Sequence, residues 1–188
     1  MKRRSFLKSA ASAVPLALAE PFASALQPQA DPSSPAHLVR AHLVAANQDR
    51  FGEIHAPAYS EILFKTSAAE TPSLFAIEHT KIMPGWGPPV HIHLAQEEWF
   101  YVTEGEVLFQ VGDQRVTLKS GDSILGPRNV PHAFTAVGPN PARMLITFSP
   151  AGHMEQFFRD TAAVGTRNMA AVSHRYGMKV VGPPLTAS

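Results

Sequence analysis

Two histidines separated by a single residue, His91 and His93, constrain the fold of this chain more than any other feature. On an α-helix, neighbours on one face are three or four residues apart, so these two side chains would diverge. On a β-strand, side chains alternate with a period of two, and both imidazoles lie on one face. The pair therefore predicts a strand from Val90 to Leu94 that directs two ring nitrogens toward one point.

Glu98 and His132 complete a possible set of metal ligands. Glu98 follows His93 by five residues, which is the wrong parity for one uninterrupted strand. The segment 94–97 is therefore predicted to turn or bulge, so that Glu98 opens the next strand and faces back, while His132 arrives from elsewhere in the sheet. Three imidazoles and one carboxylate form a mixed nitrogen and oxygen site that suits a divalent first-row metal.

The middle of the chain has the texture of a β protein. Short runs rich in β-branched and aromatic residues alternate with turns that contain Gly, Pro, Asp or Ser. The predicted strands cover residues 61–66, 74–82, 90–94, 98–103, 106–111, 115–118, 123–125, 132–137 and 144–148. Short strands at this close spacing predict a sandwich or a barrel. No internal repeat is visible, so we expect one barrel.

The C-terminal part changes to a helical pattern. Apolar and small residues recur at helical spacing, which predicts an amphipathic helix that caps the barrel; they are Met154, Phe157, Phe158, Thr161 and Ala162. We interpret this stripe as core packing. A second short helix is predicted at residues 170–176 and a last short strand at 178–181. Another short helix is predicted before the barrel, at residues 36–47.

The first 25 residues have the layout of a secretory signal. A basic start is followed by the small and apolar segment 9–19 and by Ala23-Ser24-Ala25, an A-x-A cleavage pattern. The Arg3-Arg4-x-Phe6-Leu7-Lys8 run resembles the twin-arginine export signal. We expect cleavage near Ala25, export by the twin-arginine machinery to the periplasm, and no membrane span after cleavage. The alternative is a basic amphipathic helix of the mature protein.

Charge and cysteine content limit the possible functions. Without the four basic residues and one acidic residue of the first 25, the net charge changes from +1 to −2, so the basic isoelectric point belongs to the signal. No nucleic-acid-binding patch is visible in the remainder. The chain has no cysteine, which excludes disulfides, thiolate metal sites and a lipid-modified cysteine.

Two motifs resemble those of the cupin superfamily. Gly85, His91, His93, Glu98 and Gly105 match its first motif in residue type and spacing, and Gly121, Pro127 and His132 match its second. The chain looks like a small single-domain cupin and resembles the quercetin-dioxygenase-like group. That finer likeness comes from the Pro-Pro-x-His-x-His segment and from Glu-Glu-Trp-Phe-Tyr-Val. The resemblance as a whole is strong over residues 74–148 and weaker toward Gly182-Pro183-Pro184.

The second motif departs from the family pattern at two positions. Asn129 stands where the motif usually has Gly, and Asn is among the residues that best tolerate a positive φ. Ala136 stands where the motif usually has Asn, but that position is not one of the ligands. Metal binding is therefore still expected.

The resemblance implies an all-β fold, the cupin double-stranded β-helix or jelly-roll barrel, with short flanking helices that include one C-terminal to the barrel. The expected organisation is a signal at residues 1–25, a linker and short helix at 26–50, the cupin barrel at 51–150 and a helical extension at 151–188. The resemblance also implies octahedral coordination by His91, His93, Glu98 and His132, with two positions left for water, oxygen or substrate. One divalent ion is expected per barrel, and Mn, Fe, Ni, Cu and Zn all remain open.

The expected function is that of a periplasmic metal-dependent cupin, a dioxygenase-like enzyme that acts on a phenolic, enolic or diketone small molecule. In the dioxygenases that the chain resembles, the glutamate ligand can also take a proton from the substrate, so Glu98 is the candidate catalytic base. No separate cofactor-binding residues are predicted. If the strand parity holds, a group of mainly apolar residues lines the substrate pocket: His79, Phe100, Phe109, Phe134, Met144 and Ile146.

Other functions remain open at this stage. One alternative is a non-catalytic barrel that binds a small molecule or a metal. Another is a metal-dependent isomerase or lyase, in which the same ligands hold a metal that acts as a Lewis acid without oxygen. A partner-binding barrel without metal is a further alternative. The resemblance also implies a homodimer, which would cover exposed sheet edges.

Overall fold

The structure is a computed structural model that describes residues 41–56, 60–164 and 169–187. Contacts divide the chain into residues 1–41 and 42–188, and the architecture below is that of the second part. The predicted signal and linker lie outside the described residues, as do residues 36–40 of the predicted N-terminal helix.

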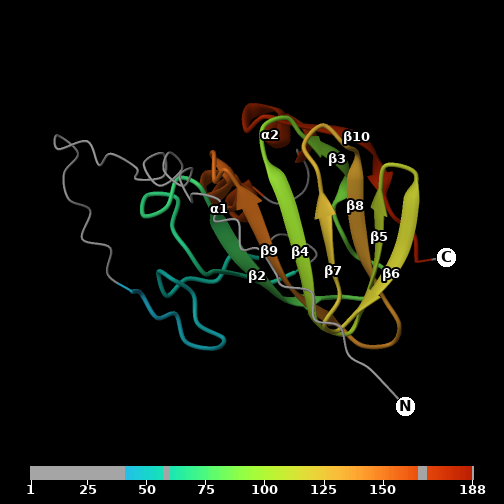
Figure 1. The fold of residues 1–188 in the computed structure, drawn as a ribbon, viewed down its shortest axis with the longest axis horizontal. Coiled ribbons are helices and arrows are strands. Elements are labelled where there is room, and N and C mark those ends of the chain that lie inside the picture. The colour runs from blue at the N-terminus through green and yellow to red at the C-terminus, as the bar shows by residue number, and fades with distance from the viewer. Residues whose placement is uncertain (1–40, 57–59, 165–168, 188) are drawn as a thin grey trace, which may run out of the picture. The chain divides into compact units, whose positions relative to one another are not determined.

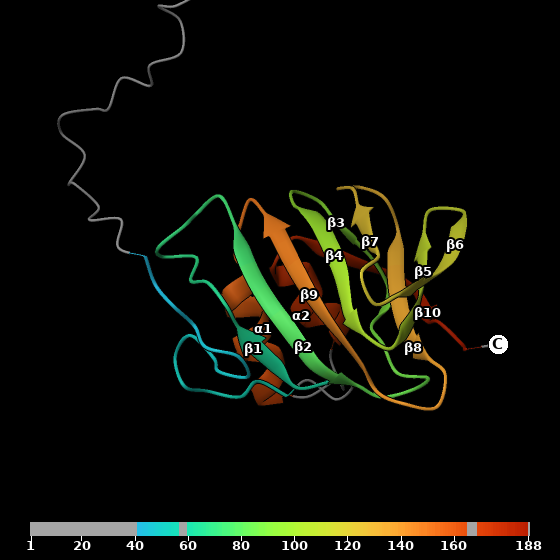
Figure 2. The ribbon, with the colours of Figure 1, turned by 60° about the horizontal axis from the view of Figure 1, so that its bottom comes forward.

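Two five-stranded antiparallel sheets make up the barrel (Figures 1 and 2). In spatial order, the first sheet contains β1 (Ile62–Phe64), β2 (Phe75–Ile82), β9 (Ala142–Ser149), β4 (Glu97–Glu104) and β7 (Ser123–Gly126). The second contains β10 (Met178–Pro184), β3 (Pro89–His93), β8 (His132–Val137), β5 (Glu106–Val111) and β6 (Gln114–Lys119). Strands adjacent in sequence thus often lie in different sheets, and the predicted all-β cupin barrel with short flanking helices is confirmed.

The inward faces of the strands form the core. Along β9, Ala142, Met144, Ile146 and Phe148 are buried while the residues between them are partly exposed. Along β2, Phe75, Ile77 and His79 are buried on one face, as the period-two pattern predicts. The side chains of both sheets meet between them, as expected for two packed sheets whose inner faces share one hydrophobic core.

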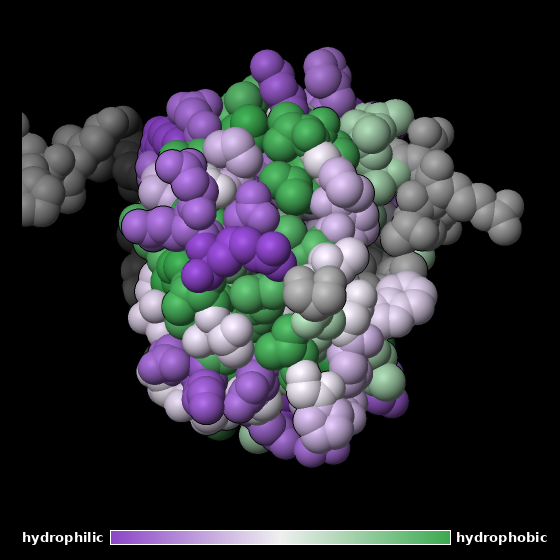
Figure 3. Space-filling model, turned by 90° about the vertical axis from the view of Figure 1, so that its right-hand side faces the viewer, coloured by the Kyte–Doolittle hydropathy of each residue, from purple (hydrophilic) through white to green (hydrophobic). Residues whose placement is uncertain are grey.

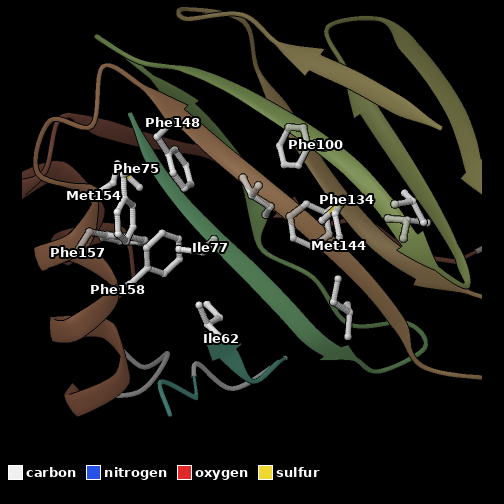
Figure 4. Packing of buried hydrophobic residues seen from close by; sticks show 14 of the residues in the cluster. Ile62, Phe75, Ile77, Phe100, Phe134, Met144, Phe148, Met154, Phe157 and Phe158 are labelled. Atoms are coloured by element: carbon white, nitrogen blue, oxygen red, sulfur yellow. The ribbon is translucent and has the colours of Figure 1, made fainter. Parts of the chain in front are cut away.

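A helix closes one end of this core. In Figure 4, Met154, Phe157 and Phe158 of α1 (Met154–Val164) face Phe75 and Phe148 of the first sheet. The ring centroids of Phe148 and Phe158 are 5.7 Å apart, within the range of favourable aromatic pairs. The shorter α2 (Met169–Arg175) leads into β10, which pairs with β3. The predicted strand at 178–181 is confirmed, and it extends to Pro184.

The helix predicted before the barrel is not present in its described part. Residues 41–50 contain turns, and Asn47 has a φ of 59°, outside the helical range. The apolar residues of this segment have no face to bury, since Leu43 is 89% exposed. A short helix without a packed apolar face is marginal in water. The segment instead anchors through Asp49, whose carboxylate accepts hydrogen bonds from the Phe51 and Phe64 amides.

The outer surface is mixed in character. The side of the molecule seen in Figure 3 shows hydrophobic side chains interspersed with hydrophilic ones. Among the described residues, no helix has the length and hydrophobicity needed to cross a membrane.

Candidate metal centre

His91 and His93 project from β3 toward the interior. Their i, i+2 spacing places both imidazoles on one side of the strand, as predicted. His93 is almost completely buried and His91 is partly exposed. A short bend at residues 94–96 then separates β3 from β4. That bend corrects the parity, so that Glu98 faces inward while its neighbour Glu97 is directed outward to Arg128.

His132 reaches the same point from β8. It is the cross-strand partner of His91 in the antiparallel β3–β8 pair, so two of the three imidazoles are direct neighbours across strands. Glu98 comes from the other sheet, where it lies opposite Gly126 of β7 and Phe148 of β9. The cluster therefore joins the two sheets across the barrel interior.

All three histidines direct Nε2 at one oxygen of Glu98. The distances from Glu98 Oε2 are 2.9 Å to His132 Nε2, 3.1 Å to His93 Nε2 and 3.9 Å to His91 Nε2. The candidate ligand atoms of the four residues all lie within 4.8 Å of one another. This arrangement can hold a metal ion, with one ligand atom from each residue.

Backbone carbonyls set the tautomers of two of these rings. His91 Nδ1 lies 2.9 Å from the Pro89 carbonyl oxygen and His132 Nδ1 lies 2.9 Å from that of Val130, so each Nδ1–H donates to a backbone carbonyl two residues earlier in the chain. Nε2 of each neutral ring is then a lone-pair ligand. His93 differs, because its buried Nδ1 has no hydrogen-bond partner in the part of the chain that the structure describes.

The acceptor atoms that face one another in this cluster indicate whether a metal ion fits. Two acceptor nitrogens and a carboxylate cannot face one another at close range unless a cation or a proton lies between them. Without a metal, His132 takes that role, since its Nε2–H donates to Glu98. A divalent cation would replace this proton, as is usual when histidine and carboxylate ligands bind a metal. The four residues therefore suit a metal ion.

The electrostatics of the cluster favour an ionised glutamate beside a neutral His91 ring. Burial lowers the pKa of His91 to about 3. Burial alone would raise the pKa of Glu98, but His93 and His132 outweigh it and hold this pKa well below its usual range. Burial also opposes the charged form of His132, yet its hydrogen bond to Glu98 raises the pKa of that imidazole above the ordinary value.

The loop between β7 and β8 supports the ligands from outside the cluster. The Asn129 amide donates to the His93 carbonyl oxygen over 2.8 Å, and Arg128 forms a two-pronged ion pair with Glu97. Asn129 has a φ of 63°, as predicted for the position where the motif usually has Gly. The loop thereby contacts the strands of three of the four candidate ligands, and supporting contacts of this kind orient metal ligands.

A mainly apolar pocket opens beside the cluster. Its empty volume is about 460 Å³, part of which is open to solvent. The wall contains residues from both sheets and from the C-terminal elements: His79, Pro88, Pro89, His91, His93, Glu98, Phe134, Ile146, Phe148, Met154, Phe157, Phe158, Met169, Ser173, Met178 and Val180. A concave apolar site with a few convergent polar groups is typical of small-molecule binding.

The predicted pocket residues divide into two groups. His79, Phe134 and Ile146 line the pocket. Phe100, Phe109 and Met144 do not line it; they are buried in the barrel core, where the Phe100 and Phe109 ring centroids are 5.0 Å apart. The parity prediction of an inward face was right for these three, but parity cannot tell which inward residues border an empty space, because that depends on the residues that face them.

Much of the pocket wall was not predicted. Phe148 continues the inward series of Met144 and Ile146, so the period-two pattern contained its signal. Met154, Phe157 and Phe158 were interpreted as core packing only, whereas they both pack on the core and line the pocket. Met178 and Val180 line it because β10 pairs with β3, a contact that no local pattern predicts.

The fold and the site together define a cupin barrel with a candidate metal centre. Residues 78–148 match the family model of the cupin domain, and this range includes all four candidate ligands. The chain is also similar to a solved RmlC-like cupin from Shewanella frigidimarina, with a TM-score of 0.51 and 26% identity over 60% of this chain and 93% of that chain. These likenesses support the placement of the chain in the cupin superfamily.

Two curated proteins are similar in sequence. Protein SchB of Streptomyces halstedii is 29% identical over 107 residues, which cover 57% of this chain and 72% of that protein. The uncharacterized protein MJ1618 of Methanocaldococcus jannaschii is 31% identical over 65 residues, 34% of this chain. In the second case the matched segment spans about half of the relative's length, 52%.

Proposed function

We propose that this protein is a metal-dependent enzyme of the oxygenase type that acts on a phenolic, enolic or diketone small molecule. The observation that carries the proposal is the convergence of three histidine Nε2 atoms and one glutamate oxygen at the wall of an apolar pocket. A metal site that borders an open pocket is typical of catalysis rather than of structural support.

His91, His93, Glu98 and His132 would hold the ion. A divalent metal bound there would act as a Lewis acid toward a substrate oxygen and, if redox-active, would support oxygen chemistry. The sequence and structure leave Mn, Fe, Ni, Cu and Zn as candidates, because raw affinity for such ligands does not decide which metal a protein carries in the cell.

Glu98 is the candidate general base. Its carboxylate is ionised near neutral pH because His93 and His132 lower its pKa in spite of burial, and it lines the pocket. A substrate hydroxyl within hydrogen-bond reach of this oxygen can transfer its proton to it. The surrounding phenylalanine and methionine side chains exclude water from the proton transfer and position the apolar part of the substrate.

The resemblance to the quercetin-dioxygenase-like group supports the same reaction class. It rests on Pro88-Pro89 before the histidine pair and on the run from Glu97 to Val102. Both prolines line the pocket, Pro89 as the first residue of β3 and Pro88 directly before it, where they are placed to contact a substrate.

We further propose that the chain is exported by the twin-arginine route, cleaved near Ala25 and active in the periplasm as a homodimer. The first proposal is supported by the pattern Arg3-Arg4-x-Phe6-Leu7-Lys8. The homodimer is supported by the resemblance to cupins and by the two sheets' open edge strands, such as β7 and β6.

The test combines metal analysis with oxygen uptake. The purified mature protein is expected to contain close to one transition-metal ion per chain by mass spectrometry, and to consume oxygen when 3-hydroxyflavone or benzoylacetone is added. Glu98→Gln is expected to abolish turnover. Glu104→Gln is the matched control, because this exposed carboxylate lies at the far end of the same strand and outside the cluster.

Two outcomes would contradict the proposal. Protein without stoichiometric metal after supplementation with each candidate ion would exclude a metal enzyme. Turnover of either compound without oxygen uptake would instead indicate an isomerase or lyase that uses the same ligands.

A further inference from the structure

The pocket wall carries almost no charge outside the metal-binding cluster. Among the described residues that line it, Glu98 is the only acidic side chain, and none is lysine or arginine. His79 adds no charge near neutral pH, because burial lowers its pKa to about 4. Ser173 is neutral, and the remaining lining residues outside the cluster are apolar.

The apolar part of the wall is built by elements far apart in the sequence. Phe134, Ile146 and Phe148 come from the two sheets, while the C-terminal elements supply Met154, Phe157, Phe158, Met169 and Met178. In Figure 4, Phe148, Phe157 and Phe158 lie around the same region of the interior. Phenylalanine and methionine side chains adapt to apolar and aromatic surfaces, to which they offer dispersion and sulfur–aromatic contacts.

The charge balance of the filled site limits what can bind. A divalent ion with one glutamate and three neutral histidines leaves one net positive charge at the cluster. This charge can balance a single negative charge on a phenolate or an enolate. A second negative charge on the same molecule would lie against the apolar wall without a cation to pair with, and an unpaired buried charge is strongly unfavourable.

We propose that this site takes neutral, mainly apolar aryl ketones, diketones or phenols, and discriminates against analogues that carry an added carboxylate or phosphate. This inference rests on the proposed function, in that the substrate oxygen binds at the metal-binding cluster. The inference adds to the proposed function a substrate class defined by charge. It assigns the selectivity against negatively charged analogues to the apolar wall of the pocket.

A matched pair of ligands tests the inference. Benzoylacetone and benzoylpyruvate share an aryl diketone and differ by the replacement of a methyl group with a carboxylate. Binding of each to zinc-loaded protein is measured by calorimetry, because Zn²⁺ has no redox chemistry and separates binding from turnover. Benzoylacetone is expected to bind at least about tenfold more tightly, a difference of roughly 1.4 kcal/mol.

Variants locate the selectivity. Val180 is a half-buried lining residue of β10, so Val180→Lys should reduce or reverse the preference for benzoylacetone. Val181→Lys is the matched control, because Val181 is the next residue on the strand and is 51% exposed. Met169→Lys on α2 places a cation at the same pocket far from the ligand strand in sequence, with exposed Ala170→Lys as its control. Zinc content is measured for every variant.

The outcomes separate this inference from the proposed function. Equal or tighter binding of benzoylpyruvate by the wild-type protein would overturn the inference, as would failure of both compounds to bind. A preference that is unchanged in both Val180→Lys and Met169→Lys would also overturn it. Tight binding of benzoylacetone without oxygen uptake by protein loaded with a redox-active metal would contradict the oxygenase proposal and still support the charge selectivity.

Discussion

His91 of β3 and His132 of β8 are direct partners across an antiparallel strand pair, and their ring centroids lie 4.6 Å apart. The two residues are distant in sequence, but the β3–β8 register brings their rings together. Each donates Nδ1–H to the carbonyl of the residue two positions earlier in the chain, Pro89 of β3 and Val130 of the loop before β8. The backbone thus presents both Nε2 atoms to Glu98, and the site is organised before any ion binds.

Metal binding should stabilise the folded protein. Because the four ligands come together only in the native barrel, a metal at one hundred times its dissociation constant should raise the free energy of unfolding by about 2.7 kcal/mol. The increase is measured from thermal melts with the metal and with a chelator. His132→Asn should lose this increase, whereas His153→Asn, at an exposed histidine outside the cluster, should retain it.

Gly87→Ala should destabilise the loop before β3. A Cβ at this position would overlap the carbonyl oxygen of Phe134, which is backbone and cannot rotate away. The expected loss is about 1–3 kcal/mol in the free energy of unfolding, measured with urea. Gly85→Ala is the comparison, because Gly85 has a positive φ of 77° but open space around it. A smaller loss of unfolding free energy in Gly87→Ala than in Gly85→Ala would contradict the close packing of Gly87 against the Phe134 backbone.

His79 should make the fold sensitive to mild acid. Burial lowers its pKa from 6.5 to about 4, so the unfolded chain binds this proton more readily than the native protein does. The contribution of neutral His79 to the free energy of unfolding is fully present above pH 6.5 and decreases as the pH falls toward 4. His79→Phe should flatten the dependence of the unfolding free energy on pH in this window. An unchanged slope between pH 7 and 4 would show that His79 is not buried as a neutral ring.

Glu78 should make the free energy of unfolding depend on pH in a more acidic range than His79 does. Burial would raise its pKa, but hydrogen bonds from Arg143 and Lys65 outweigh burial and lower it from 4.5. The distances are 2.6 Å to Arg143 and 2.8 Å to Lys65. Its contribution is therefore present above pH 4.5 and is lost as the pH falls below that value. Glu78→Gln should cost about 1 kcal/mol at pH 7, with the difference from wild type shrinking by pH 3.

The route of export should influence which metal the protein carries. The proposed twin-arginine route moves folded proteins, so on that proposal the ion would be loaded inside the cell, before the chain meets surroundings rich in copper and zinc. Expression with residues 1–25, the proposed leader, and with a general secretory leader in their place should give different metal contents by mass spectrometry. Identical metal from both routes would contradict this prediction.

Much of the candidate metal site could be predicted because the patterns that define it are local. The spacing of His91 and His93 requires a strand, and the parity of Glu98 requires a bend before it; both follow from the period of a β-strand. The positive φ of Asn129 follows from the turn that its motif position requires. The predicted helix at residues 36–47 was wrong over its described part, because helix formation there needed a packed face that the barrel does not offer.

The sequence by itself predicted the shared face of His91 and His93 and the bend before Glu98, because side-chain alternation is a property of the backbone and needs no partner. The meeting of these side chains with His132 depends on the β3–β8 register. Only the tertiary structure decided which inward residues border open space. Phe100 and Phe109 fill one part of the barrel with each other, while Phe157 and Val180 reach the pocket wall through the docking of α1 and the pairing of β10 with β3. Those long-range contacts depend on packing between segments that are distant in sequence, and the spacing of residues along the chain does not predict such packing.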